Sequence, residues 1–334
     1  MTKISVRCGF CFLLLCLAAM SSGAADILPF RTQNQSPLVA IYGLPAIGGA
    51  RVAAKAEGTL RLTLDQANNY VHEVRAGESL VLDGESARLT VSGRYGIGRS
   101  VEVGVDIPFL ISGGGFLDGS LESYHSAFGF PNGGRELAPK NRLLYRYQKN
   151  GITLLNMEQS GQGLGDVSLS GAWQICRSAD NQRNLALSGR LKLPAGDVGS
   201  LRGSGSTDLA VWVSGDWGHS FSAGQFTAFG AAGAMAMTKG RVLADQQNPL
   251  VGFGALGAGF APACWIELKV QANAHTSFYS DSDLAEVNAP SVQLTLGGAL
   301  HLTKKTSLDI GVTEDIMVGT SPDVVFHFSL AHKF

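Results

Sequence analysis

The sequence predicts an all-β protein: a transmembrane, antiparallel, up-and-down β-barrel of about 12 strands. Apolar and polar residues alternate in segment after segment, which places them on opposite faces of a strand. The chain begins with an export signal and closes on a strand that ends in Phe334. The 43 glycines and only 16% charged residues favour strands and tight turns.

The first 25 residues are typical of a signal peptide. Lys3 and Arg7 precede an apolar stretch at 10–20, and small residues follow at 21–25. We expect export through the Sec pathway, with cleavage after Ala24 or Ala25. The apolar stretch is shorter than the roughly 20 residues that a membrane-spanning helix needs, and no later segment comes closer. A lipoprotein anchor at Cys16 is disfavoured because the preceding residue is not small.

Charge and cysteine content exclude some classes of protein. The formal charge is -1, and loss of Lys3 and Arg7 with the signal peptide changes it by two, to -3. Such a near balance gives no support to nucleic-acid binding. Cys176 and Cys264 fall on non-adjacent predicted strands and opposite faces, which favours two free thiols over a periplasmic disulfide.

The terminal strand, residues 323–334, shows the alternation most clearly. One face carries Val324, Phe326, Phe328, Leu330 and Phe334, and the other His327, Ser329, Ala331 and Lys333. The first face suits lipid and the second suits water. Periplasmic chaperones and the outer-membrane insertion machinery are expected partners, and Phe334 is the expected assembly signal.

Eleven further segments alternate in the same way. They are 59–65, 86–97, 101–107, 166–176, 184–193, 208–217, 220–238, 250–260, 264–275, 291–303 and 308–316. The two Gly/Ala-rich segments at 220–260 have the least certain registers. Twelve strands satisfy the even number that a closed barrel needs when both ends lie in the periplasm. Short connections at 98–100 and 303–306 are expected to face the periplasm. A soluble β-sandwich would bury its apolar faces and needs neither a signal peptide nor a terminal Phe.

The inward positions are rich in charge. The predicted lumen-lining residues are Arg61, Asp65, Arg88, Arg94, Glu102, Asp106, Arg190, Lys192, Asp208, Asp216, Glu267, Lys269, Asp309 and Asp315. Six are cationic and eight acidic, so the interior is either wet or filled with ion pairs. Mixed signs argue against strong ion selectivity. Trp212 and Trp265 are also expected to face inward and would tolerate aromatic or amphipathic solutes.

Two regions do not alternate. The first, residues 26–56, contains Pro29, Pro37 and Pro45 and is poorly suited to a strand. It is either a lumen plug, with Phe30, Arg31 and Tyr42 as its marked residues, or a tethered leader.

The second non-alternating region is a long extracellular loop at 113–163, too long for an ordinary hairpin connection. Within it, Arg142 to Met157 has the pattern of an extra hairpin that would extend the flanking strands above the membrane. The barrel domain as a whole spans 57–334.

Several sequence segments resemble those of a known family. Pro29 to Leu38, Tyr42 to Pro45, Leu82 to Glu85, Gly114 to Gly119 and Phe128 to Arg135 are similar to the proteobacterial barrels catalogued as domain of unknown function 3187. The resemblance covers essentially the whole mature chain and implies an outer-membrane barrel of a Gram-negative bacterium, without an assigned activity. More loosely, Gly163 to Trp173 and Leu191 to Asp197 resemble barrels linked to the degradation and uptake of aromatic compounds.

These observations favour a passive channel for small, aromatic or amphipathic solutes. One alternative is an outer-membrane lipid hydrolase that uses His125 and Ser126 with Glu122 and Asp118. No Gly-x-Ser-x-Gly elbow supports it. The other alternative is a sealed structural barrel filled by ion pairs.

The remaining expectations concern cofactors and the bilayer. Scattered histidines and cysteines offer no metal-ligand spacing, and no cofactor is expected. Tyr42, Tyr95, Trp173 and Trp217 are candidates for aromatic belts at the surfaces of the outer-membrane lipid.

Overall fold

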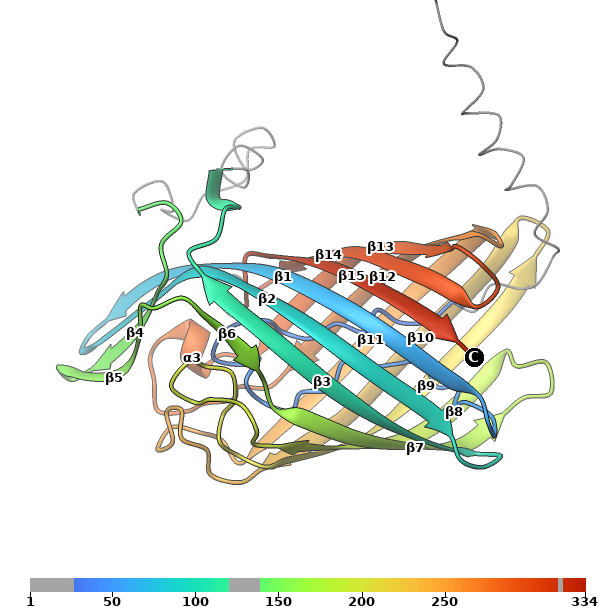
Figure 1. The fold of residues 1–334 in the computed structure, drawn as a ribbon, viewed down its shortest axis with the longest axis horizontal. Helices are drawn as coiled ribbons and strands as arrows, with labels where there is room; N and C mark the ends of the chain where they lie inside the picture. Colours follow the sequence, from blue (N-terminus) through green and yellow to red (C-terminus); the bar gives the residue numbers. More distant parts are fainter. Residues whose placement is uncertain (1–26, 120–138, 318–320) are drawn as a thin grey trace, which may run out of the picture.

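Twelve strands close into an antiparallel barrel in the computed structural model, which describes residues 27–119, 139–317 and 321–334 (Figure 1). In wall order they are β1 (Gly58–Arg75), β2 (Glu78–Gly96), β3 (Val101–Gly113), β7 (Val167–Arg177), β8 (Arg183–Leu193), β9 (Asp208–Phe221), β10 (Gly224–Met237), β11 (Leu250–Ala263), β12 (Ile266–His275), β13 (Ser291–His301), β14 (Thr306–Asp315) and β15 (Val324–Lys333). This confirms the predicted fold class.

The first and last strands complete the wall. Thr59 of β1 lies opposite Lys333 of β15, and the pairing continues to Asn68 and Val324. At the rim, Gly58 and Phe334 exchange both backbone hydrogen bonds, at 3.1 and 3.0 Å. No barrel strand is therefore left with an open edge, as hydrocarbon requires.

The alternation separates a lipid face from a lumen face. On β1, the Leu60, Leu62 and Leu64 side chains are 55%, 44% and 36% exposed, whereas Arg61 and Thr63 are 8% and 5% exposed. Apolar groups remain exposed in this way only where lipid replaces water around them. The outside of the barrel is thus an apolar surface, and polar side chains fill the inside.

The two ends of the barrel differ in their connections. Short turns join β2 to β3, β7 to β8, β9 to β10, β11 to β12 and β13 to β14 at the end where Gly58 and Phe334 meet. Longer connections lie at the opposite end, which we call the outer end. The exception there is the tight turn between β1 and β2, in which Gly77 has a φ of +80°.

Above the wall, β1 and β2 extend into a small sheet. β4 (Leu144–Lys149) and β5 (Ile152–Met157) form the extra hairpin predicted at 142–157, and β4 pairs with residues 78–83 of β2. β6 (Gly161–Leu164) pairs with the outer part of β3.

Three expectations from the sequence are wrong in detail. β1 runs to Arg75 rather than ending at Asp65, because residues 67–69 are buried on both faces and so do not alternate. Trp265 lies in the turn between β11 and β12 and not on an inward strand position. Val324, expected on the lipid face, is buried at the outer end of β15.

Regular helix is almost absent from the described residues. The short α3 (Ala285–Asn288) lies in the connection between β12 and β13. No helix in the described part of the chain is long and apolar enough to cross a bilayer.

Candidate functional site

The lumen contains a continuous stretch of chain. Residues 27–56, which we call the inserted hairpin, rise through the barrel, turn near the outer end and return to the start of β1, drawn in dark blue in Figure 1. The segment forms no strand. Lumen-facing side chains of the wall instead hold its backbone, as the contacts below show.

The rising arm is bound mainly by β12. Gln271 acts as a substitute for a neighbouring strand: its Oε1 accepts from the Phe30 N–H at 2.8 Å, and its Nε2 donates to the Phe30 carbonyl at 3.1 Å. Lys269 places its ammonium 4.2 Å from the centre of the Phe30 ring, a cation–π contact. Further out, Asn34 Nδ2 lies 3.0 Å from His275 Nε2.

The tip of the inserted hairpin, residues 36–44, is sealed under the outer connections. Leu38 is fully buried, and the Tyr42 ring stacks on Phe278 with centroids 5.0 Å apart. The Tyr279 hydroxyl donates to the Leu38 carbonyl at 2.9 Å, and the Ser36 hydroxyl donates to Glu286 at 2.6 Å. Tyr42 therefore lies inside the protein, so its assignment to an aromatic belt is wrong.

The tip belongs to the main apolar cluster of the protein. Leu80, Leu82, Tyr145 and Tyr147 of the small sheet pack in the same cluster, together with residues of the outer connections. The largest apolar cluster of the described residues thus lies at the outer end of the barrel.

The descending arm passes close to the wall. The Gly43 N–H donates to Asp208 Oδ2 at 2.7 Å, and a Cβ at this position would lie 3.0 Å from that of Lys192. Nearer the short-turn end, Gln174 repeats the strand-like contact, because it accepts from the Val52 N–H at 2.9 Å and donates to the Ala50 carbonyl at 2.9 Å.

The wall's own charges form compact ion-pair groups. Lys192 contacts Asp166 at 2.7 Å and Asp208 at 3.1 Å. Asp309 contacts Lys269 at 2.6 Å and Arg61 at 3.2 Å. These pairs connect wall residues to one another and do not require the inserted hairpin to balance them.

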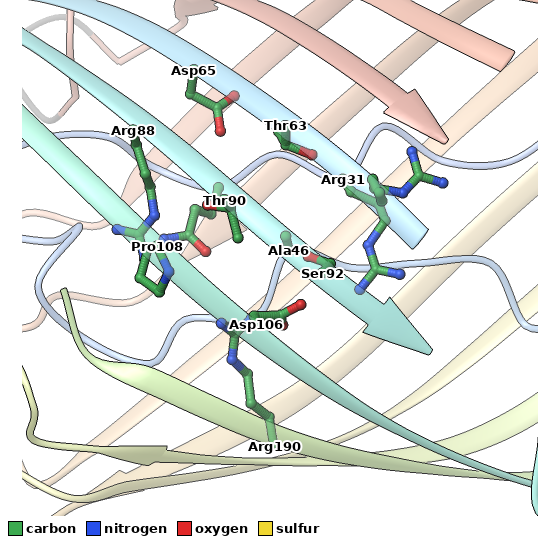
Figure 2. A pocket seen from close by; sticks show the side chains of 12 residues that line it. Arg31, Ala46, Thr63, Asp65, Arg88, Thr90, Ser92, Asp106, Pro108 and Arg190 are labelled. Atoms are coloured by element: carbon green, nitrogen blue, oxygen red, sulfur yellow. Dashed lines mark ion pairs between the residues drawn. The ribbon is translucent and has the colours of Figure 1, made fainter. Parts of the chain in front are cut away.

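A third group surrounds a small cavity. Arg94 NH2 reaches both oxygens of Asp106, at 2.8 and 2.9 Å, and Arg190 lies 3.5 Å from the same carboxylate. Beside them is a cavity of about 30 Å³, whose lining side chains appear in Figure 2. A second cavity, of about 20 Å³, lies along the rising arm near His275. Their volumes correspond to one or two water-sized groups each.

The structure places all fourteen predicted lumen residues on the inner side of the wall. Ten are buried, and four are half-buried near the rims, namely Arg94, Glu102, Asp216 and Asp315. Glu102 accepts from the Ala53 N–H at 2.9 Å and Asp216 from the Ala50 N–H at 3.2 Å, so they hold the base of the inserted hairpin.

Sequence reasoning did not single out Gln174, Gln271, Asp166, His327 or Glu286. The two glutamines occupy inward strand positions. Their role could not be predicted, because it consists of hydrogen bonds to the backbone of the inserted hairpin, and the sequence does not show that this backbone lies opposite them. His327 was recognised as inward, and its Nδ1 lies 2.7 Å from Asp65 Oδ1.

The hydrolase candidates are only partly described. Glu122, His125 and Ser126 lie outside the described residues, as does the signal peptide. Asp118 is buried, and its carboxylate accepts from Asn68 Nδ2 at 3.1 Å and the Asn141 N–H at 2.8 Å. The described residues contain no group of three metal-ligating side chains. Cys176 and Cys264 are free thiols.

Solved structures with a similar fold are outer-membrane proteins. The COG4313 outer membrane channel from Pseudomonas putida F1 superposes with a TM-score of 0.51 and 11% identity, covering 85% of this chain and 97% of the channel. The NanC porin gives 0.41 and 9%, covering 83% and 98%. The CymD monoaromatic hydrocarbon channel gives 0.36 and 10%, covering 84% and 89%. At these identities the first match shows the fold alone, and the other two carry no argument.

No curated protein matches the sequence. A family model does match, over residues 8–334, and its description is "Protein of unknown function (DUF3187)". This match covers nearly the whole chain and shows that the protein belongs to the DUF3187 family.

Proposed function

We propose that the protein is a passive channel for small solutes in the outer membrane, closed in this structure by the inserted hairpin acting as a plug. One observation carries the proposal: the lumen is filled by a single chain segment that side chains hold and that pairs with no strand. Such a segment can leave without breaking the backbone ladder of the wall.

The wall is suited to water once the inserted hairpin leaves. Lys192, Asp309 and Asp106 of the wall are each already paired with other wall residues. A barrel of about eight strands is narrow enough for side chains of the wall itself to fill its interior, and this wall has twelve strands. Here much of the interior is taken by a stretch whose chain continues into β1 at the short-turn end.

The direction of opening follows from the connections. With cleavage after Ala24 or Ala25, the rising arm has a free end, and residues 54–57 tether the segment at the short-turn rim. The inserted hairpin would therefore leave toward the periplasm. Trp212 and Phe253, with ring centroids 6.2 Å apart in the lumen wall, would then suit aromatic or amphipathic solutes.

The test is single-channel conductance in planar lipid bilayers. We would compare the refolded full-length protein with a variant lacking residues 27–53, which keeps the 54–57 connection to β1. Heat-modifiable electrophoretic mobility reports whether each barrel is folded. Brief, infrequent steps from the full-length protein and sustained steps from the deletion variant are expected.

A disulfide lock supplies a matched control within one molecule. A Cβ on Gly43 would lie 3.1 Å from that of Asp208, a few tenths of an ångström from disulfide geometry. Gly43→Cys with Asp208→Cys, in a Cys176→Ser, Cys264→Ser background, should be silent when oxidised and conduct when reduced. Folded barrels that stay silent after both the deletion and the reduction would contradict the channel.

A further inference from the structure

The larger lumen cavity has an excess of positive charge. Four arginines line it, Arg31, Arg61, Arg88 and Arg190, against two carboxylates, Asp65 and Asp106. Arg88 comes from β2, Arg190 from β8 and Arg31 from the inserted hairpin (Figure 2). The remaining lining is mostly polar and includes Gln33, Thr63, Thr90 and Ser92.

Both carboxylates are already engaged by other residues. Asp106 receives Arg94 on both oxygens and Arg190 at 3.5 Å. Asp65 lies opposite Arg88 in the β1–β2 pairing, yet its Oδ1 is 2.7 Å from His327 Nδ1. The two acids therefore leave part of the arginine charge unmatched.

The unmatched charge lies on Arg88 and Arg31. Arg88 is 9% exposed, and its NH1 donates to the Ala40 carbonyl at 2.9 Å, but it forms no ion pair within the described residues. Arg31 is half-buried and has neither an ion pair nor a hydrogen bond among those residues. The Arg190 Nε is buried without a partner. Buried guanidinium groups without a counter-charge are costly unless an anion joins them.

We propose that this cavity binds the carboxylate group of a small organic anion. A carboxylate matches the planar fork of a guanidinium with two parallel hydrogen bonds. The cavity, about 30 Å³, suits a group of three heavy atoms rather than a larger tetrahedral anion. Thr90 and Ser92 hydroxyls are available as further donors.

The site joins two parts of the protein. Arg31 belongs to the inserted hairpin, whereas Arg88 and Arg190 belong to the wall, so a bound carboxylate bridges plug and barrel. When the inserted hairpin leaves, Arg61, Arg88 and Arg190 remain against Asp65 and Asp106. If the protein is a channel as proposed, the site predicts that it prefers small organic acids as transported solutes. The binding site itself does not depend on the channel function.

The test measures binding without a membrane. Refolded full-length protein in non-ionic detergent at low ionic strength is dialysed to equilibrium against ¹⁴C-formate. Arg31→Gln and Arg88→Gln each remove one guanidinium from the site. Arg146→Gln is the matched control, because Arg146 pairs with Glu158 on the exposed small sheet, away from the lumen. Arg31 lies outside the wall, so its variant leaves the barrel intact.

We expect saturable binding of one formate per chain, weakened about tenfold or more by Arg31→Gln or Arg88→Gln and unchanged by Arg146→Gln. Acetate should displace formate, whereas inorganic phosphate and chloride should do so only at about tenfold higher concentration. No saturable binding, or equal binding by all variants, would overturn the site. Equal competition by phosphate or chloride would overturn the carboxylate assignment.

The two proposals fail separately. Formate binding to a protein that never conducts would overturn the channel and keep the site. Sustained conductance by the variant lacking residues 27–53, with no formate binding to the full-length protein, would overturn the site and keep the channel.

Discussion

The tip and the base of the inserted hairpin are held by different forces. At the tip, Leu38 and Tyr42 are buried in the main apolar cluster, 0% and 2% exposed. At the base, the backbone of residues 50–53 is bound by single polar side chains, and Arg51 is exposed to solvent. Water can replace polar contacts of this kind but cannot replace apolar burial.

Under the proposed function, this difference indicates how the plug would close and open. Burying one large apolar side chain contributes about 1.5–3 kcal/mol, whereas one hydrogen bond contributes about 0.5–1.5 kcal/mol. We therefore expect the tip to set most of the free energy of closure. In the proposed opening, release toward the periplasm would start at the base, which lies at the tethered end.

The largest expected effect comes from emptying the tip. Tyr42→Ala removes the ring that stacks on Phe278, and a large-to-small change of this kind costs about 3–5 kcal/mol. The single-channel open probability should rise at least a hundredfold. Tyr95→Ala, which removes an exposed outward-facing ring on β2, is the matched control and should leave the open probability unchanged. Equal effects would show that the tip does not govern closure.

The next effect is a pH dependence at the tip. Burial raises the pKa of Glu286 well above its usual value, and Asp315, Asp323 and Glu73 raise it further, against a hydrogen bond from Ser36 that lowers it. The docked tip thus favours the protonated acid. As pH rises through the range between the undocked and docked pKa values, docking weakens, and open probability should rise by up to about tenfold per pH unit. Glu286→Gln should flatten this rise; a slope that survives would assign the titration to another group.

A smaller effect is expected at the base. Gln174→Ala leaves the Val52 N–H and the Ala50 carbonyl without their partner, a loss of about 1–2 kcal/mol because water can enter there. Open probability should increase by roughly five- to thirtyfold. Gln148→Ala on β4, which loses only a surface hydrogen bond to Thr153, is the control. An effect larger than that of Tyr42→Ala would reverse the comparison between tip and base.

The smallest effect tests the exposed part of the base. Arg51 NH2 donates to the Asn181 carbonyl at 3.2 Å at the surface. Arg51→Gln should change the free energy of closure by no more than about 0.5 kcal/mol. The change is measured from closed and open dwell times in the bilayer recording. A larger change would mean that the base contributes more to closure than its hydrogen bonds indicate.

The sequence predicted most of the wall but little of how the lumen is filled. Alternation alone predicts which face of β1 carries Leu60, Arg61 and Leu62, because the side chains of neighbouring strand residues point to opposite sides of the sheet. The same rule failed at residues 67–69, where both faces are buried and no alternation remains. The sequence predicts Tyr42 both as a plug residue and as an aromatic-belt residue, because it lies outside any alternating segment that would assign it to one face.

The candidate site shows the same limit. Arg31 and Arg88 could be named from the sequence, as residues of the N-terminal segment and of an inward face. A count of six cationic against eight acidic inward groups predicted no preference of sign. The cavity lies beside four arginines and two carboxylates, and Asp106 is already paired with Arg94; this arrangement depends on distances that the count does not contain.

The sequence by itself determined the barrel, its approximate strand number and the inward face of fourteen charged residues, because these follow from a period of two that neighbouring residues impose on one another. Only the tertiary structure decided that residues 27–56 occupy the lumen. The contacts that hold them join residues far apart in the chain, such as Phe30 with Gln271 and Gly43 with Asp208. Contacts of that separation leave no local pattern in the sequence, because they depend on which inward side chains of the closed wall reach the same volume.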